Sequence, residues 1–233
     1  MVLAGRDPVR PFPLLRCSNH GASEFCKDPC RGRGPVSQHE EEARAALRAR
    51  QGAGARYDAP TAPANELDWA RRGTAYFARL LMNLSDGALA GPSKIAGVDR
   101  RWLVAAIGLQ ARMLAEAVAW VRSNSSHHLP FDLAVDQQEI ALAATLPCQA
   151  LRNLFAHSEV HLNVEWRDLA DDDWSGWAED RNGKRLAVSA TPKIRAIRLW
   201  NCAIQLDAGG RSSDIPGSLR GLPVVSGDPL PLL

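Results

Sequence analysis

The sequence lacks the features that would place it in several broad classes of protein. Its 233 residues carry 28 Lys and Arg against 26 Asp and Glu, so the net charge is only +2. That balance gives no strong field to attract nucleic acid or an acidic membrane surface. No unbroken apolar run approaches the roughly 18 residues that span a bilayer. The first residues, MVLAGRDPVRPFPLL, hold charges and prolines in place of the apolar core of a signal peptide. We therefore expect a cytoplasmic protein that binds neither nucleic acid nor membrane.

The sequence also lacks an even number of cysteines. The five cysteines are Cys17, Cys26, Cys30, Cys148 and Cys202. An odd number in a chain without an export signal favours free thiols over a disulfide framework. Three of them form the pattern C-x2-H-x5-C-x3-C together with His20. These four side chains can hold zinc and organise an interaction arm, or the segment can be an extension without fixed structure.

Composition divides the chain into three parts. Residues 1–65 are rich in Pro, Gly and Arg without a sustained apolar period, which predicts a disordered N-terminal arm. Residues 66–219 carry helical periodicity and are the expected globular domain. Residues 220–233 are rich in Gly and Pro and predict a flexible tail.

Apolar spacing predicts a mainly α fold. The helices are expected over 67–84, 100–122, 148–169 and 192–208, with a shorter helical region after Asp132. Asn65 and Thr191 are expected to be N-cap residues, with Pro192 as the first residue of the last helix. Short alternating runs around DRNGK, between Trp174 and Val188, predict a small hairpin before that helix. The pattern is typical of a four-helix bundle with one long excursion.

Five segments, in order and at matching spacing, carry a family resemblance. They are Leu67–Tyr76 (LDWARRGTAY), Leu84–Gly97 (LSDGALAGPSKIAG), Arg100–Leu114 (RRWLVAAIGLQARML), Leu154–His157 (LFAH) and Arg195–Gly209 (RAIRLWNCAIQLDAG). From Leu67 to about Leu219 the chain resembles the mycothiol-dependent maleylpyruvate isomerase family, whose N-terminal domain is a DinB-like four-helix bundle. The resemblance covers about two-thirds of the chain.

The resemblance implies a particular metal site. Family members typically bind a divalent metal through a His on the second helix and a Glu and a His four residues apart on the last helix. In this sequence those positions hold Ala106, Arg198 and Cys202. A methyl group cannot bind a metal, and a guanidinium repels one. We therefore predict a divergent member without the metal, either a pseudoenzyme or a binder of a small carboxylate. Mycothiol or another low-molecular-weight thiol, and a homodimer, are further possibilities that the resemblance implies.

Arg198 and Cys202 lie one turn apart on a face expected to look into the bundle. Arg198 can hold a carboxylate, or it can lower the pKa of Cys202 and make it a nucleophile. The second case would give an active metal-free thiol-dependent isomerase or transferase. Alternatively, Arg198 pairs with a buried acid or reaches the surface, while Cys202 packs as a small hydrophobe. Gln110, one turn after Ala106, can donate to a ligand or satisfy a neighbouring polar group.

His157 and His161 are spaced to share a metal, and Glu165 follows at the same interval. The charged and polar residues around them favour a solvated helix face instead.

Overall fold

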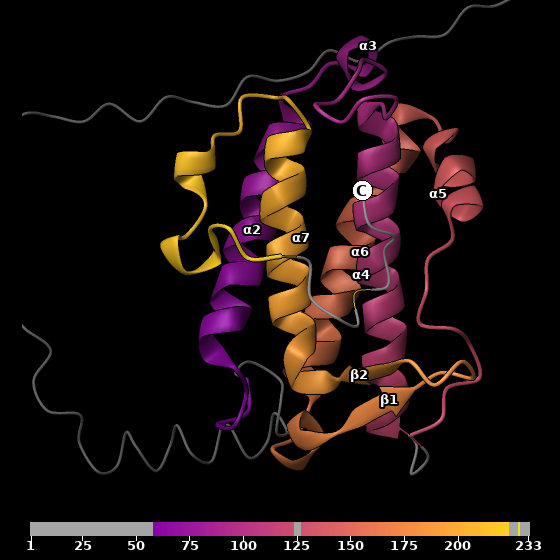
Figure 1. Ribbon diagram of the computed structural model, residues 1–233, viewed down its shortest axis with the longest axis vertical. Coiled ribbons are helices and arrows are strands. Elements are labelled where there is room, and N and C mark those ends of the chain that lie inside the picture. Colours follow the sequence, from indigo (N-terminus) through magenta and orange to yellow (C-terminus); the bar gives the residue numbers. More distant parts are fainter. Residues whose placement is uncertain (1–57, 124–126, 224–227, 229–233) are drawn as a thin grey trace, which may run out of the picture. The chain divides into compact units, whose positions relative to one another are not determined.

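Four long helices form a bundle in the computed structural model, which describes residues 58–123, 127–223 and 228 (Figure 1). The long helices are α2 (Ala64–Met82), α4 (Arg100–Ser123), α6 (Cys148–Asp168) and α7 (Thr191–Gln205). The shorter ones are α3 (Asp86–Leu89) and α5 (Gln137–Ala144), with 3-10 turns η1 (Asp172–Ser175), η2 (Val188–Ala190), η3 (Ser212–Asp214) and η4 (Gly217–Leu219). The predicted mainly α, DinB-like fold is confirmed. The predicted arm of residues 1–65 lies almost wholly outside the described residues.

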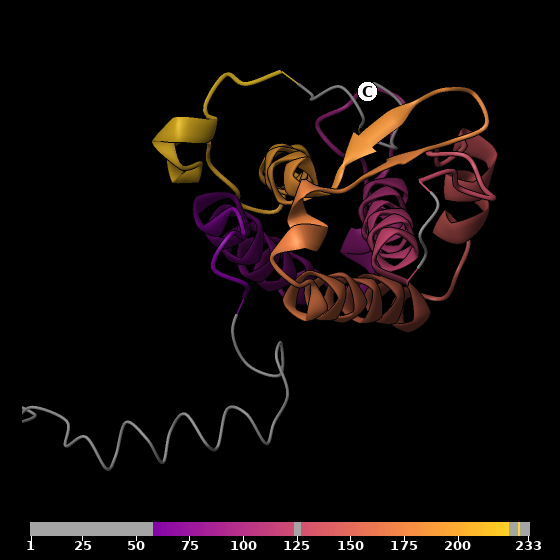
Figure 2. The same ribbon diagram turned by 90° about the horizontal axis from the view of Figure 1, so that it is seen from below.

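The long helices pack mainly in two pairs. α2 runs along α7 and α4 runs along α6, while α4 also meets α7 and closes the interior (Figure 2). The buried apolar side chains fall into two clusters that share these helices. One cluster includes Leu114, Trp166 and Ile197, and the other includes Phe77 and Ile107. Along α4 the boundary between the two clusters falls at Gln110, whose side chain is polar.

The start of α7 differs by one residue from the sequence prediction. Thr191 is the first helical residue, and Ala190 precedes the helix. The Thr191 hydroxyl does not cap the helix, because it donates to the carbonyl of Val188 at 2.7 Å and accepts from Nε1 of Trp166 at 2.9 Å. A buried indole N–H requires a partner, so the hydroxyl joins α6 to α7.

The start of α2 also differs from the prediction. Asn65 lies inside the helix, and Pro63 occupies the position before its first residue. Arg71 connects the first half of α2 to its surroundings. Its guanidinium makes two hydrogen bonds to Asp58, at 2.6 and 2.7 Å, and one to Asn163 on α6 at 2.8 Å.

The predicted hairpin is present before α7. Strand β1 (Trp177–Glu179) pairs antiparallel with β2 (Arg185–Ala187), and the hairpin packs on α4 (Figure 2). The Asp180 carboxylate accepts N–H bonds from Asn182, Lys184 and Leu133, each at 2.9 Å. Burial opposes ionisation of Asp180, but these three donors and the Lys184 charge outweigh it and lower its pKa. The ionised Asp180 holds the turn and thereby fixes where Lys184 lies.

Helix α4 is long and apolar enough to cross a membrane by length and composition. However, 72% of the apolar 18-residue stretch of α4 that meets this test is buried inside the protein. A central helix of a packed bundle meets the same test, because it is covered by other helices on most sides.

Candidate functional site

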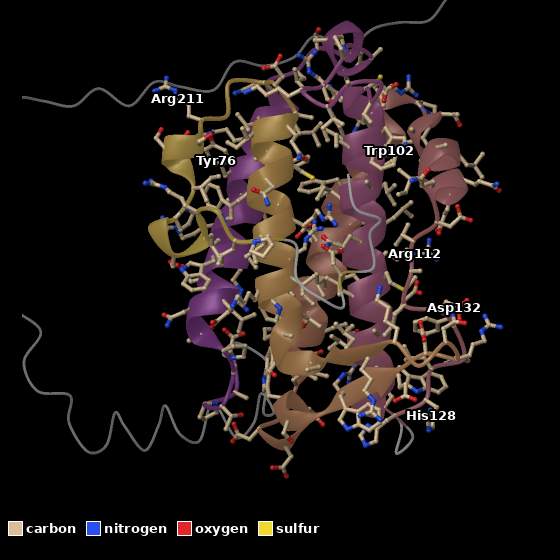
Figure 3. All side chains as sticks on the ribbon, viewed as in Figure 1. Tyr76, Trp102, Arg112, His128, Asp132 and Arg211 are labelled. Atoms are coloured by element: carbon tan, nitrogen blue, oxygen red, sulfur yellow. The ribbon has the colours of Figure 1, made fainter. Side chains whose placement is uncertain are left out.

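A group of polar side chains lies in the interior between the two apolar clusters. We call it the polar layer, and it consists of Thr74, Gln110, Glu159, Arg195, Arg198 and Asp228. All but Thr74 are buried, and Gln110 and Arg195 are fully buried. Figure 3 shows nitrogen and oxygen atoms gathered between α7 and α4 at mid-height of the bundle. Burying so many polar groups costs free energy unless each finds a partner.

Arg195 joins three helices. Its Nη1 donates to the carbonyl of Ile107 at 2.9 Å and to Oε1 of Gln110 at 2.6 Å, both on α4. Its Nη2 pairs with the carboxylate of Glu159 on α6. Glu159 also accepts from the Thr74 hydroxyl on α2, at 2.7 Å. Burial lowers the pKa of Arg195 to about 9, so the guanidinium remains charged at neutral pH.

Arg198 holds the carboxylate of Asp228. Its Nε lies 2.9 Å from Oδ2 of Asp228, and the amide of Gln110 donates to Oδ1 at 2.8 Å. Both partners of the ion pair are 4% exposed. The backbone carbonyl of Asp228 accepts from Nζ of Lys184 at 2.9 Å, and the same ammonium donates to the carbonyl of Leu133 at 2.7 Å. Burial lowers the pKa of Lys184 below its usual value, although Asp228 and Asp180 oppose the shift.

The structure therefore places a residue of the expected flexible tail, Asp228, in the interior. Its partner Gln110 is 118 positions away in sequence. Of the alternatives for Arg198, pairing with a buried acid is the one observed.

Cys202 lies one turn after Arg198 and is fully buried. Burial raises the pKa of its thiol to about 12, against the opposing effect of Arg198 and Arg195. Such a thiol is protonated at neutral pH and inaccessible to a substrate in this conformation, which argues against a nucleophilic role. Ala106 is fully buried in the same apolar cluster as Cys202.

These residues do not fit a divalent metal. Ala106 offers no donor atom, Arg198 is cationic, and Cys202 alone is a single ligand, which does not make a metal site. Within the described residues no group of three or more His, Cys, Asp or Glu side chains is placed to hold a metal ion. The zinc candidates Cys17, His20, Cys26 and Cys30 lie outside the described residues.

The His157–His161 stripe lines a separate surface groove on α4 and α6. The groove measures about 430 Å³, and its lining residues are Arg112, Glu116, Leu154, His157, Ser158 and His161. Glu165 is 2.9 Å from Arg122 and 3.5 Å from His161. Glu165, the third residue of the stripe, therefore pairs with the guanidinium of Arg122. His157, His161 and Glu165 thus do not form a three-ligand metal site.

Sequence reasoning missed four residues of the polar layer, Thr74, Glu159, Arg195 and Asp228, and also Lys184, which binds the backbone of Asp228. Arg195 carried a usable signal, because it lies three residues before Arg198 on a helix with an otherwise apolar face. A cation at such a position requires a buried acid. The sequence did not show which of the 26 acidic residues that would be.

Comparisons with known proteins agree with the fold. The mycothiol maleylpyruvate isomerase N-terminal domain family matches residues 70–200. Two solved structures are similar to the chain. A histidine-to-alanine variant of the mycothiol-dependent maleylpyruvate isomerase matches with a TM-score of 0.61 and 30% identity, and the mycothiol-dependent maleylpyruvate isomerase itself with 0.60 and 29%. Each alignment covers 66% of this chain but only 65% of the solved structure. No curated protein matches the sequence.

Proposed function

Because the chain belongs to the mycothiol maleylpyruvate isomerase N-terminal domain family, we propose that it is a divergent member that binds a small carboxylate where its relatives bind a metal. The observation that carries this proposal is the buried carboxylate of Asp228, held by Arg198 and Gln110. We assign the protein to the cytoplasm as part of the same proposal.

Loss of the metal is supported by the chemistry of the three positions that the family resemblance implies. Ala106, Arg198 and Cys202 are all buried, on the facing helices α4 and α7. A single substitution would leave a weakened site, but here only Cys202 could bind a metal, and Arg198 carries a positive charge. A thiol cofactor such as mycothiol needs a metal or a base to become a thiolate. These residues supply neither, so we derive no isomerisation step and favour a non-catalytic role.

Carboxylate binding is supported by the donors that converge on Asp228. Arg198 and Gln110 approach different oxygens of one carboxylate, so they fix both its position and its orientation. The Arg198 bond is charge-assisted and lies away from water, where such bonds are strongest. Substitution of the metal ligands has thus replaced a cation-binding centre with an anion-binding one.

The metal-free state is tested by elemental analysis of the full chain purified without chelator. We expect no stoichiometric zinc, nickel or manganese bound to the bundle. A Cys26→Ser/Cys30→Ser variant is the control, because metal lost with these two thiols belongs to the N-terminal segment. Stoichiometric metal that persists in this variant would contradict the proposal.

Carboxylate binding is tested by calorimetric titration with pentanoate in an Asp228→Ala background, where the internal carboxylate is gone. Adding Arg198→Met is expected to weaken pentanoate binding at least about tenfold, since a hydrogen bond to a charged group contributes about 1.5–3 kcal/mol. Equal binding with and without Arg198 would show that this guanidinium is not the anchor.

A further inference from the structure

The groove on α4 and α6 is lined by hydrogen-bond donors that the fold itself leaves largely unused. The donors are Arg112 from α4 and His157, Ser158 and His161 from α6, and Leu154 adds an apolar side chain. Arg112 lies on the side of α4 that faces away from α7 (Figure 3). The groove is therefore separate from the polar layer, which lies between α4 and α7.

Ser158 is the buried donor of the groove. The residue is only 6% exposed, yet its hydroxyl has no hydrogen-bond partner in the part of the chain that the structure describes. Most buried hydroxyls bond to a neighbouring carbonyl or side chain, because an unpaired buried polar group costs free energy. A buried hydroxyl that lines a groove without a partner indicates a ligand that supplies the acceptor.

Arg112 presents an oriented guanidinium to the same groove. Its Nε donates to Oε1 of Glu116 at 2.9 Å, one turn further along α4. Its two Nη groups make no hydrogen bond to any of the described residues. The Glu116 carboxylate thus holds the guanidinium and has its charge balanced by it. The two Nη groups remain available as the fork that binds two oxygens of one phosphate.

His157 and His161 lie one turn apart on α6, on either side of Ser158 in sequence. Each imidazole donates through one ring N–H when neutral and through two when protonated. The only acid near them on α6 is Glu165, which lies 3.5 Å from Nε2 of His161 and pairs with Arg122 at 2.9 Å. The charge of that acid is therefore shared with a cation, and the imidazoles add donors to the groove.

Leu154 gives the groove a fixed apolar wall. It packs so closely on α4 that a Cβ at Gly108 would lie 3.0 Å from its Cγ. The groove measures about 430 Å³, which is within the range of small-molecule sites and larger than one inorganic anion requires. The ligand that fits it therefore combines an anionic group with an organic one.

We propose that this groove binds a small organic phosphate monoester. Arg112 holds two phosphate oxygens, Ser158 and the imidazoles donate to the oxygens that remain, and Leu154 contacts the organic group. Donors on four side chains suit the three strong acceptor oxygens of a phosphate monoester better than the two oxygens of a carboxylate. This site does not depend on the carboxylate site proposed in the polar layer, so each can be tested without the other.

The probe for the test is phenyl phosphate. Phenyl sulfate is the matched anion of the same shape with less charge, and inorganic phosphate lacks the organic group. All three are titrated calorimetrically into the full-length wild type, Arg112→Met and Ser158→Ala. The matched control is Arg72→Met, because Arg72 forms an exposed ion pair with Asp68 one turn away on α2, as Arg112 does with Glu116 on α4.

We expect the wild type to bind phenyl phosphate with a Kd below about 1 mM, as suits a ligand of this size. Arg112→Met should weaken binding at least about tenfold, because it removes charge-assisted hydrogen bonds, and Ser158→Ala at least about threefold. Phenyl sulfate and inorganic phosphate should each bind at least about threefold more weakly than phenyl phosphate. Arg72→Met should behave as the wild type. Amide chemical-shift changes should centre on His157, Ser158 and His161.

Each contrary outcome removes a stated part of the proposal. Equal affinity of the wild type and Arg112→Met, or the absence of binding at about 10 mM phenyl phosphate, would overturn the site. Equal affinity for phenyl phosphate and phenyl sulfate would overturn selection of the phosphate. Equal affinity for phenyl phosphate and inorganic phosphate would overturn recognition of the organic group. Circular dichroism checks folding, which the exposed position of Arg112, at 62% of its side chain, should leave intact.

Discussion

Arg195 on α7 forms an ion pair with Glu159 on α6, and the Arg195 side chain is completely buried. The neighbouring pair of Arg198 and Asp228 is 4% exposed on each side. Each guanidinium in the polar layer therefore has one carboxylate of its own. This pairing explains how an interior can contain two cations, because an unpaired buried charge is strongly destabilising.

Removing the Glu159 charge is expected to destabilise the fold. In Glu159→Gln the buried guanidinium of Arg195 loses its carboxylate, so the free energy of unfolding should fall by about 3 kcal/mol. Urea denaturation followed by circular dichroism measures the change. Glu116→Gln is the matched control, because Glu116 pairs with Arg112 on an exposed face and should cost less than about 1 kcal/mol. Equal effects of the two substitutions would contradict the importance of the buried pair.

The Cys202 thiol is expected to resist alkylation. With its pKa raised to about 12 by burial, it should not react with iodoacetamide in the native protein between pH 7 and 10. Cys148, which is only partly buried, should react in the same experiment. Peptide mass spectrometry identifies the labelled cysteine. Labelling of Cys202 in the native protein near pH 7 would contradict this prediction and support Cys202 as a nucleophile.

The same raised pKa predicts a pH dependence of stability. Between pH 9 and 12 the unfolded thiol loses its proton while native Cys202 keeps it, so the unfolded state binds fewer protons and stability falls as the pH rises. The free energy of unfolding of the wild type, measured relative to Cys202→Ala, should fall by about 1.4 kcal/mol per pH unit in that window. A difference that does not change with pH would mean that the thiol ionises equally in both states.

The stability of the fold is expected to depend on the hydroxyl group of Thr191 and not on the size of its side chain. Thr191→Val keeps the shape but leaves the indole N–H of Trp166 and the carbonyl of Val188 without the hydroxyl partner they share. A buried unsatisfied group costs about 1–3 kcal/mol. Thr191→Ser retains the hydroxyl and should cost less than Thr191→Val in the same thermal unfolding measurement. The reverse order would assign the role to the methyl group.

The backbone after α7 is expected to tolerate no side chain at Gly210. A Cβ there would lie 2.5 Å from the carbonyl oxygen of Ala203 and 3.2 Å from Leu80. Gly210→Ala should therefore destabilise the protein by about 1–3 kcal/mol, as overpacking does. At Gly87 a Cβ would meet nothing within 4 Å, and Gly87→Ala in α3 should be neutral or slightly stabilising. Equal denaturation midpoints for both variants would contradict this prediction.

Local patterns predicted the helices and the hairpin well, because apolar spacing and turn residues act over a few positions. They placed the starts of α2 and α7 less accurately. Asn65 and Thr191 have the side chains of N-caps, but in the folded protein the Thr191 hydroxyl is bound to Trp166, 25 positions away. A competing tertiary partner decided the outcome at that end, and no local pattern reveals such a partner.

The sequence by itself determined the family and the mainly helical fold, and it led to the prediction that Ala106, Arg198 and Cys202 stand where the family resemblance places metal ligands. These follow from short-range periodicity and from side-chain chemistry, which are properties of the chain. Only the tertiary structure decided what those residues do. In the folded protein the Cys202 thiol is buried and keeps its proton, and Arg195 forms an ion pair with Glu159. The carboxylate of Asp228 binds Arg198 and Gln110. The physical reason is that a buried cation must have a counter-charge, and the fold alone selects which acidic residue supplies it.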